Sequence, residues 1–258
     1  MGIGALVAPL ALVVAGCAAP PPSPAAGTTT ASPSTVSPTT ASSTTPAADY
    51  RTVEFPARDG EVRTGRVFGA GPVAVVLSHM GRTGDGQDDW AGYASELAGL
   101  GIRALTYEGR RLGMEDGWKD VLGAVDHLVA SGAERVVLAG ASIGAMASLR
   151  AAGEAPPQVA GVIWLAGVRA EEGYDFQPAD VAGLGCPTLF IVGDKDAYGA
   201  AGDTREMQGW ATAGSELLIV DSLRHGTDIL ADGGTSAEQV RSAMTEFVQQ
   251  VAAAPTAC

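Results

Sequence analysis

The sequence predicts a doubly wound α/β fold around a mostly parallel sheet of about eight strands. Short apolar runs bounded by Gly, Pro or charged residues alternate with segments whose apolar residues have helical spacing. The apolar runs are nearly continuous, which is typical of parallel strands covered by helices on both faces. Ligands of such open sheets bind beyond the carboxyl ends of the strands.

The strands are expected, in chain order, at 52–55, 62–68, 73–78, 102–107, 135–140, 159–167, 187–193 and 216–220. The first two have no helix between them, so we expect an antiparallel hairpin at the edge of the sheet. Helical spacing places helices at 88–100, 117–131, 143–153, 203–213 and 236–253.

The first 48 residues contain no Asp, Glu, Lys or Arg. Residues 3–15 are almost wholly apolar, too short for a stable membrane span and suited to a secretion signal. The sequence "VAGC" follows and resembles a bacterial lipobox, so residues 1–17 are interpreted as a lipoprotein signal peptide with Cys17 as the lipidated residue. The Pro-, Ser- and Thr-rich stretch 18–49 is expected to be a disordered tether.

All the charged residues lie beyond residue 48, and we expect the segment 50–258 to be the folded domain. The formal net charge of −13 argues against nucleic acid as a partner, and the lipid anchor is the only membrane attachment expected. We expect an extracytoplasmic, membrane-anchored monomer. Cys186 and Cys258 can form a disulfide in an oxidising compartment or remain two thiols, because no spacing rule links them.

The stretch "RVVLAGASIG" contains the candidate nucleophile, Ser142. The pattern Gly-x-Ser-x-Gly also occurs by chance in a glycine-rich chain, so its context decides. Here a strand precedes it and a helix follows, as in a nucleophile elbow. Gly140 and Gly144 fit a sharp turn in which the strand and helix backbones approach closely.

A serine hydroxyl needs a base and an acid that orients it. His225 follows the last strand and is the candidate base, whereas His127 lies within a predicted helix. "GDKD" after the preceding strand offers Asp194 and Asp196, and we choose Asp196 because it lies further into the turn. The oxyanion donors are expected to be the N–H groups of Ile143 and of Met80, with Gly81 as the alternative to Met80.

The motifs "SHMG", "GASIG", "GDKD" and "RHG", in this order, resemble the α/β-hydrolase superfamily over residues 50–253. The short segment 168–180, without room for a sizeable lid, is most similar to dienelactone-hydrolase-like and small esterase forms. The resemblance implies a catalytic triad of Ser142, Asp196 and His225. It also implies an acyl-enzyme mechanism on small or accessible esters, lactones or thioesters.

Further substrate contacts are expected from residues near these motifs, namely His79, Gly81, Arg82 and Trp164. Arg82 and Arg224 flank the oxyanion loop and the base, and either can hold a substrate carboxylate. No metal or organic cofactor is expected, because the histidines are scattered. Two alternatives to ester hydrolysis remain: acyl transfer to an alcohol of the cell envelope, and a non-catalytic, lipid-tethered binding protein with the same fold.

Overall fold

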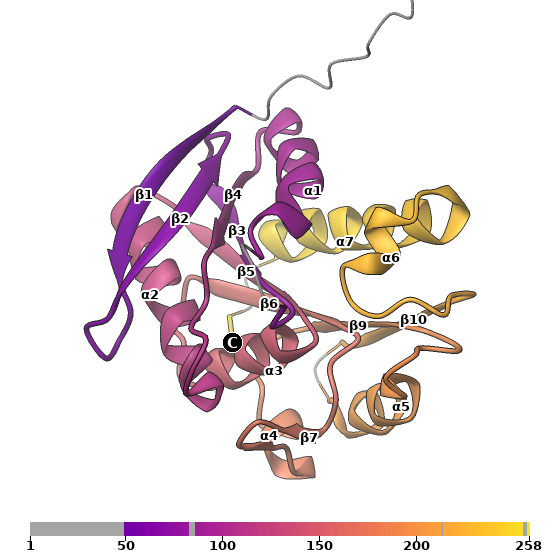
Figure 1. Ribbon diagram of the computed structural model, residues 1–258. Helices are drawn as coiled ribbons and strands as arrows, with labels where there is room; N and C mark the ends of the chain where they lie inside the picture. Colours follow the sequence, from indigo (N-terminus) through magenta and orange to yellow (C-terminus); the bar gives the residue numbers. More distant parts are fainter. Residues whose placement is uncertain (1–48, 83–85, 213, 255–256) are drawn as a thin grey trace, which may run out of the picture. The chain divides into compact units, whose positions relative to one another are not determined.

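The computed structural model describes residues 49–82, 86–212, 214–254 and 257–258 (Figure 1). The predicted signal peptide, Cys17 and nearly all of the predicted tether lie outside these residues. The principal strands are β1 (Tyr50–Pro56), β2 (Val62–Phe68), β3 (Val73–Ser78), β4 (Arg103–Tyr107), β5 (Arg135–Ala141), β6 (Val159–Leu165), β9 (Thr188–Gly193) and β10 (Glu216–Val220). The principal helices are α1 (Asp88–Gly99), α2 (Gly117–Ala130), α3 (Ile143–Ala152), α5 (Ala200–Trp210) and α7 (Gly234–Ala253).

The eight strands form one sheet in the order β1-β2-β4-β3-β5-β6-β9-β10. β1 pairs with β2 and β2 with β4 in antiparallel fashion, whereas all the remaining pairs are parallel. The predicted fold class and the predicted edge hairpin are therefore confirmed. Because the parallel strands run the same way, the loops that follow β3, β5, β6, β9 and β10 meet at one edge.

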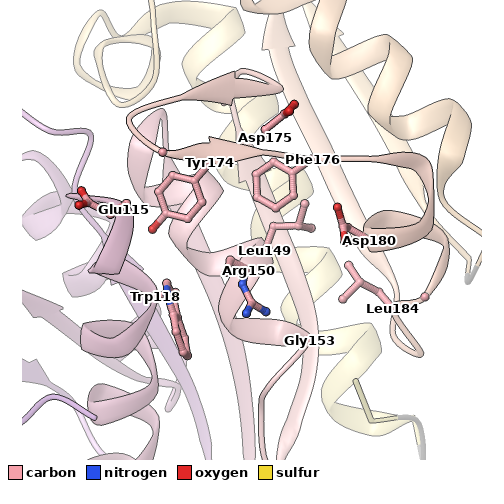
Figure 2. Close-up of a pocket in the computed structure, with 12 residues that line it drawn as sticks. Glu115, Trp118, Leu149, Arg150, Gly153, Tyr174, Asp175, Phe176, Asp180 and Leu184 are labelled. Carbon is pink, nitrogen blue, oxygen red and sulfur yellow. The ribbon is translucent and has the colours of Figure 1, made fainter. Parts of the chain in front are cut away.

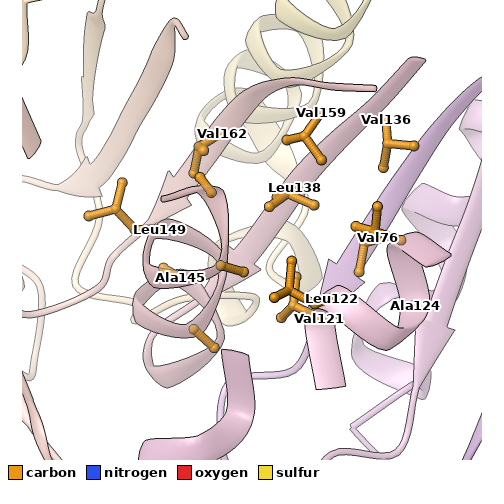
Figure 3. Close-up of a cluster of buried hydrophobic side chains, with 14 of the residues drawn as sticks. Val76, Val121, Leu122, Ala124, Val136, Leu138, Ala145, Leu149, Val159 and Val162 are labelled. Carbon is orange, nitrogen blue, oxygen red and sulfur yellow. The ribbon is translucent and has the colours of Figure 1, made fainter. Parts of the chain in front are cut away.

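Helices cover both faces of the sheet (Figure 1). On one face α2 and α3 pack against the strands, and Figure 3 shows Val76, Leu138 and Val162 of the strands turned towards side chains of these helices. On the other face α1 and α7 contribute Trp90, Leu97, Met244 and Phe247, among others, to a second buried cluster. Burial on both faces explains why the strand sequences are continuously apolar.

A disulfide joins Cys186 to Cys258. Of the two possibilities that the spacing left open, a bridge or two thiols, the structure has the bridge. The bridge fastens the segment after α7 to the loop before β9, and the Cys258 N–H donates to the Val159 carbonyl at 2.9 Å. The Arg135 guanidinium supports the same region, because it donates to the carbonyls of Val251 and Ala254 near the end of α7. The C-terminal segment is thus held against the amino-terminal ends of the central strands.

Several short elements were not expected from the sequence. They are a 3₁₀ turn at Met114–Asp116, a two-stranded hairpin of β7 (Ala170–Glu171) and β8 (Tyr174–Asp175), α4 (Pro178–Ala182) and α6 (Asp228–Ala231). The hairpin and α4 occupy the segment for which no sizeable lid was predicted. Among the described helices, none is both long and apolar enough to cross a membrane.

Candidate active site

Ser142 occupies a strained turn between β5 and α3. Its backbone has φ 50° and ψ −121°, a conformation that non-glycine residues rarely adopt. The neighbouring glycines permit this turn: a Cβ on Gly140 would lie 2.0 Å from the Gly144 carbonyl oxygen, and one on Gly144 would lie 2.2 Å from that of His79. The strand and the helix therefore approach too closely for any side chain at these two positions.

His225 lies in the loop after β10 and is 5% exposed. Its Nδ1 lies 3.1 Å and 3.0 Å from the two carboxylate oxygens of Asp196. A carboxylate only accepts hydrogen bonds, so Nδ1 carries a proton, and in a neutral ring Nε2 then presents its lone pair. Within the described residues, this buried Nε2 has no hydrogen-bond partner.

Asp196 is held by its own loop as well as by His225. Its Oδ1 accepts hydrogen bonds from the N–H groups of Tyr198 at 2.9 Å and Ala200 at 3.4 Å. Asp194 instead accepts from the Ser222 N–H and pairs with Lys195 on the surface. Of the two carboxylates considered from the sequence, only Asp196 contacts His225.

One cavity of about 240 Å³, called the Ser142 cavity, contains Ser142 and His225 together. Because the carboxyl ends of β3, β5, β9 and β10 share one edge, the loops that follow them all reach it. The cavity is lined by Met80, Gly81, Arg82, Met114, Ser142, Ile143, Glu171, Glu172, Tyr198 and His225.

The loop after β3 supplies the predicted oxyanion region. The Gly81 N–H donates to His79 Nδ1 at 2.9 Å and is therefore already engaged. Within the described residues, the N–H groups of Met80 and Ile143 have no acceptor, and both residues line the Ser142 cavity. This difference favours Met80 over Gly81 as the second donor.

His79 lies behind this loop, in an adjacent cavity of about 120 Å³ called the His79 cavity. Its ring is enclosed so tightly that a Cβ on Gly109 would lie 1.6 Å from Nε2. Burial lowers the pKa of His79 from its usual value, which keeps the ring neutral and leaves Nδ1 free to accept from Gly81. His79 thus braces the loop rather than facing Ser142.

Three residues expected to contact substrate, Trp164, Arg82 and Arg224, are placed differently from the expectation. Trp164 has no exposed surface, and its Nε1 donates to Thr204 of α5 at 3.2 Å, so it lies in the core and not at the Ser142 cavity. Arg82 does line the cavity, but its guanidinium pairs with Asp228 and with Asp89. Arg224 pairs with Asp232 away from this cavity.

Four residues at the Ser142 cavity were not identified from the sequence: Met114, Glu171, Glu172 and Tyr198. The Tyr198 ring lies against the His225 ring with centroids 4.4 Å apart, while 73% of the tyrosine remains exposed. "GDKDAYG" offered a weak signal for Tyr198, since an aromatic residue two positions after a candidate acid can cover the base. No sequence signal marks the three others.

A larger cavity of about 550 Å³, called the Trp118 cavity, is lined by residues of the β7–β8 hairpin, α2 and α3, among others (Figure 2). Figure 2 shows the rings of Tyr174 and Phe176 beside each other, with Leu149 and Arg150 of α3 below them and Trp118 to one side. Its lining contains no Ser, Thr, Cys or His. The described residues also contain no group of three or more His, Cys, Asp or Glu side chains that could hold a metal ion.

The structure is similar to solved structures of esterases and lactone hydrolases. It aligns with a dienelactone hydrolase from Anabaena variabilis with a TM-score of 0.65 and 19% identity, over 79% of this chain and 98% of that one. For Est1E from Butyrivibrio proteoclasticus the values are 0.63 and 15%, over 79% and 99% of the two chains. For an enol-lactonase from Burkholderia xenovorans they are 0.61 and 17%, over 76% and 99%.

The sequence itself matches no protein-family model and no curated protein. At these identities the likeness concerns the fold, and the chain has an α/β-hydrolase-type fold.

Proposed function

We propose that this protein is a serine hydrolase that cleaves carboxylic esters, lactones included. The observation that carries the proposal is the unpartnered Nε2 of buried His225, in the same cavity as the strained Ser142, with Nδ1 fixed by Asp196. A buried nitrogen without a partner is costly, so its presence beside the strained Ser142 calls for an explanation, and a substrate-binding role supplies one. The fold, shared with esterases and lactone hydrolases, supports the proposal by analogy.

In the proposed reaction, Ser142 Oγ attacks the ester carbonyl carbon while His225 Nε2 takes the hydroxyl proton. The N–H groups of Met80 and Ile143 donate to the carbonyl oxygen as it becomes negative. Collapse of the tetrahedral intermediate breaks the bond to the alcohol, which leaves with the proton from His225. Water then attacks the acyl-enzyme by the same route, and Ser142 regains its proton.

Asp196 has two roles in this scheme. Its carboxylate accepts from Nδ1, which holds the tautomer whose Nε2 can accept a proton. It also stabilises the imidazolium that forms in each transition state. The N–H groups of Tyr198 and Ala200 hold the carboxylate in place.

Hydrolysis of p-nitrophenyl esters from acetate to dodecanoate, by the full chain in detergent, tests the proposal. We expect turnover of the short esters, because the Ser142 cavity has a volume of only about 240 Å³. Ser142→Ala should lower kcat/KM by a factor of about 10³ or more, since it removes the nucleophile. Equal activity of the variant and the wild type would refute the assignment.

We also propose that residues 1–17 export the protein as a lipoprotein anchored through Cys17, with 18–49 as the tether. The support is the apolar segment that ends in "VAGC" and the Pro-, Ser- and Thr-rich stretch after it, which carries no charge up to residue 48. Expression of the full chain with Cys17→Ser should move the esterase from the membrane fraction to the soluble fraction. An unchanged distribution would contradict the anchor.

A further inference from the structure

We propose that the Ser142 cavity selects esters that carry a positively charged group. The inference rests on the proposed ester hydrolysis and names the substrate class of the same site. Two unpaired carboxylates, an exposed aromatic ring and the unpartnered nitrogen of a buried histidine meet in this cavity. Together they specify where the reacting carbonyl and the charge of a substrate lie.

The charge balance of the cavity is negative. Glu171 and Glu172 line it and are exposed, and their side chains form no hydrogen bond or ion pair with other described residues. Arg82, a basic residue in the lining, pairs with Asp228 and with Asp89, which lies 3.4 Å from its Nε. The two glutamates are therefore left to attract a cation, and the arginine is not free to attract an anion.

The His79 cavity next to it does not change this balance. It shares Gly81, Arg82 and Met114 with the Ser142 cavity and also contains Arg110 and Arg111. Arg110 is buried and pairs with Asp120 and Asp59, while Arg111 pairs with Glu108. Each of these arginines therefore already has a carboxylate that offsets its positive charge.

The backbone conformation of Glu172 is a further reason to assign a role to its side chain. Glu172 has φ 49° and Gly173 has φ 85°, and the two form the two-residue turn of the β7–β8 hairpin. Such a turn favours Asn or Gly at its first position, because a glutamate there is strained. A glutamate is present despite this strain, and its residue lies in the lining of the Ser142 cavity.

Tyr198 and His225 complete the site. Cations are attracted to the faces of aromatic rings, and Tyr198 is 73% exposed in the cavity lining. His225 also lines this cavity, and its Nε2, across the ring from the Nδ1 that contacts Asp196, has no partner among the described residues. With Ser142 in the same lining, we expect the ester group to bind at this end. The side chains of Met80, Met114 and Ile143 give an apolar surface on which the methyl groups of an alkylated amine can rest.

A matched pair of esters tests the inference with the full chain. Acetylcholine and 3,3-dimethylbutyl acetate have the same shape and differ in one charge. A second pair, p-nitrophenyl 4-(trimethylammonio)butyrate and p-nitrophenyl 5,5-dimethylhexanoate, places the charge on the acyl side instead. We expect at least one cationic ester to exceed its neutral match in kcat/KM by about tenfold at low salt, and the ratio to shrink at 0.5 M NaCl.

Charge-removing variants locate the effect. Glu171→Gln combined with Glu172→Gln should bring the ratio of cationic to neutral ester close to one. Glu115→Gln is the control, because Glu115 also is an exposed glutamate but lines the Trp118 cavity. The ratio should remain unchanged in that variant.

Binding without turnover separates this inference from the proposed chemistry. Calorimetric titration with phenyltrimethylammonium should show binding to the wild type that weakens at least fivefold in the double glutamine variant. Equal rates for both members of each ester pair, or preference for an ester of succinic acid with a free carboxylate, would overturn the inference and leave ester hydrolysis standing. Cation binding without cleavage of any ester would instead refute the hydrolase.

Discussion

The Ser142 cavity and the Trp118 cavity are both lined in part by the β7–β8 hairpin, but only the first contains a serine and a histidine. Glu171 and Glu172 face the first cavity, whereas Tyr174 and Asp175 face the second. The Trp118 cavity is more than twice as large, with about 550 Å³ against about 240 Å³. A further cavity, beside Asp221 and Ser236, is larger still at about 620 Å³, so volume alone does not identify a site.

The difference lies in one buried polar atom, since exposed glutamates without a protein partner line both cavities. In the Trp118 cavity, Arg150 pairs with Glu154 and lies over the Trp118 ring at 4.9 Å, and Asp175 pairs with Arg169. In the Ser142 cavity, His225 Nε2 and two glutamates have no partner among the described residues. The glutamates are exposed to water, whereas Nε2 is buried, and a buried unsatisfied atom beside a strained residue is consistent with a site that a substrate completes.

The largest difference between the two cavities is expected when the proposed base, His225, is removed. His225→Gln eliminates the proton acceptor, and we expect kcat/KM for p-nitrophenyl acetate to fall by a factor of about 10³ or more. Arg150→Gln changes a charged residue of the Trp118 cavity and should alter kcat/KM less than twofold. Comparable losses in both variants would mean that the Trp118 cavity takes part in the reaction.

Substitutions of glycine by alanine near the two cavities should differ in their effect on stability. In Gly144→Ala the new Cβ would lie 2.2 Å and 2.6 Å from the carbonyl oxygens of His79 and Ser78, which are backbone atoms. We expect the free energy of unfolding to fall by about 3 kcal/mol, together with a loss of activity.

Gly153 is the matched position in the lining of the Trp118 cavity. It has φ −67°, and its new Cβ would have its nearest neighbour at 3.6 Å. Gly153→Ala should therefore change the free energy of unfolding by less than about 0.5 kcal/mol. Urea denaturation of both variants measures the contrast, and equal stability of the two would contradict the close approach at the elbow.

The smallest effect is expected from the support of the oxyanion loop. His79→Leu removes the acceptor for the Gly81 N–H and should lower kcat about tenfold, because Met80 is then less well positioned. His79→Asn can keep an acceptor oxygen near the position of Nδ1 and should recover part of this loss. Failure of Asn to recover more activity than Leu would argue against the hydrogen bond.

The lowered pKa of His79 also predicts that the stability of the fold depends on pH. Burial lowers its pKa from the usual value of 6.5, so below that pH the unfolded chain binds more protons than the folded one. Stability should fall as the pH drops below about 6.5, and His79→Asn should reduce the slope between pH 7 and 5. Thermal unfolding across this range measures the difference, and identical slopes would contradict it.

Much of the fold could be predicted because buried parallel strands leave a direct pattern in the sequence. The runs at 73–78 and 135–140 correspond to β3 and β5, and helical spacing found five helices. Gly140, Ser142 and Gly144 could be recognised because the elbow leaves no room for side chains there. Chain order and strand ends then led to Asp196 and His225.

The parts that were missed have physical reasons. β7 and β8 have two residues each, too few for any periodicity, so Glu171 and Glu172 could not be placed at the cavity. Trp164 lies near the end of a strand buried on both faces, and the sequence does not tell which face it joins. The disulfide depends on a Cα separation of 4.3 Å between residues 72 positions apart, which spacing alone does not predict.

The most direct test of the central claim is the reaction of the full chain with a fluorophosphonate, followed by mass spectrometry of the labelled peptides. Only a serine activated by a neighbouring base reacts readily with this reagent. We predict one phosphonyl group per chain, located on Ser142, and loss of labelling in His225→Gln. An unlabelled protein, or a label on another serine, would contradict the claim that Ser142 and His225 form the catalytic centre.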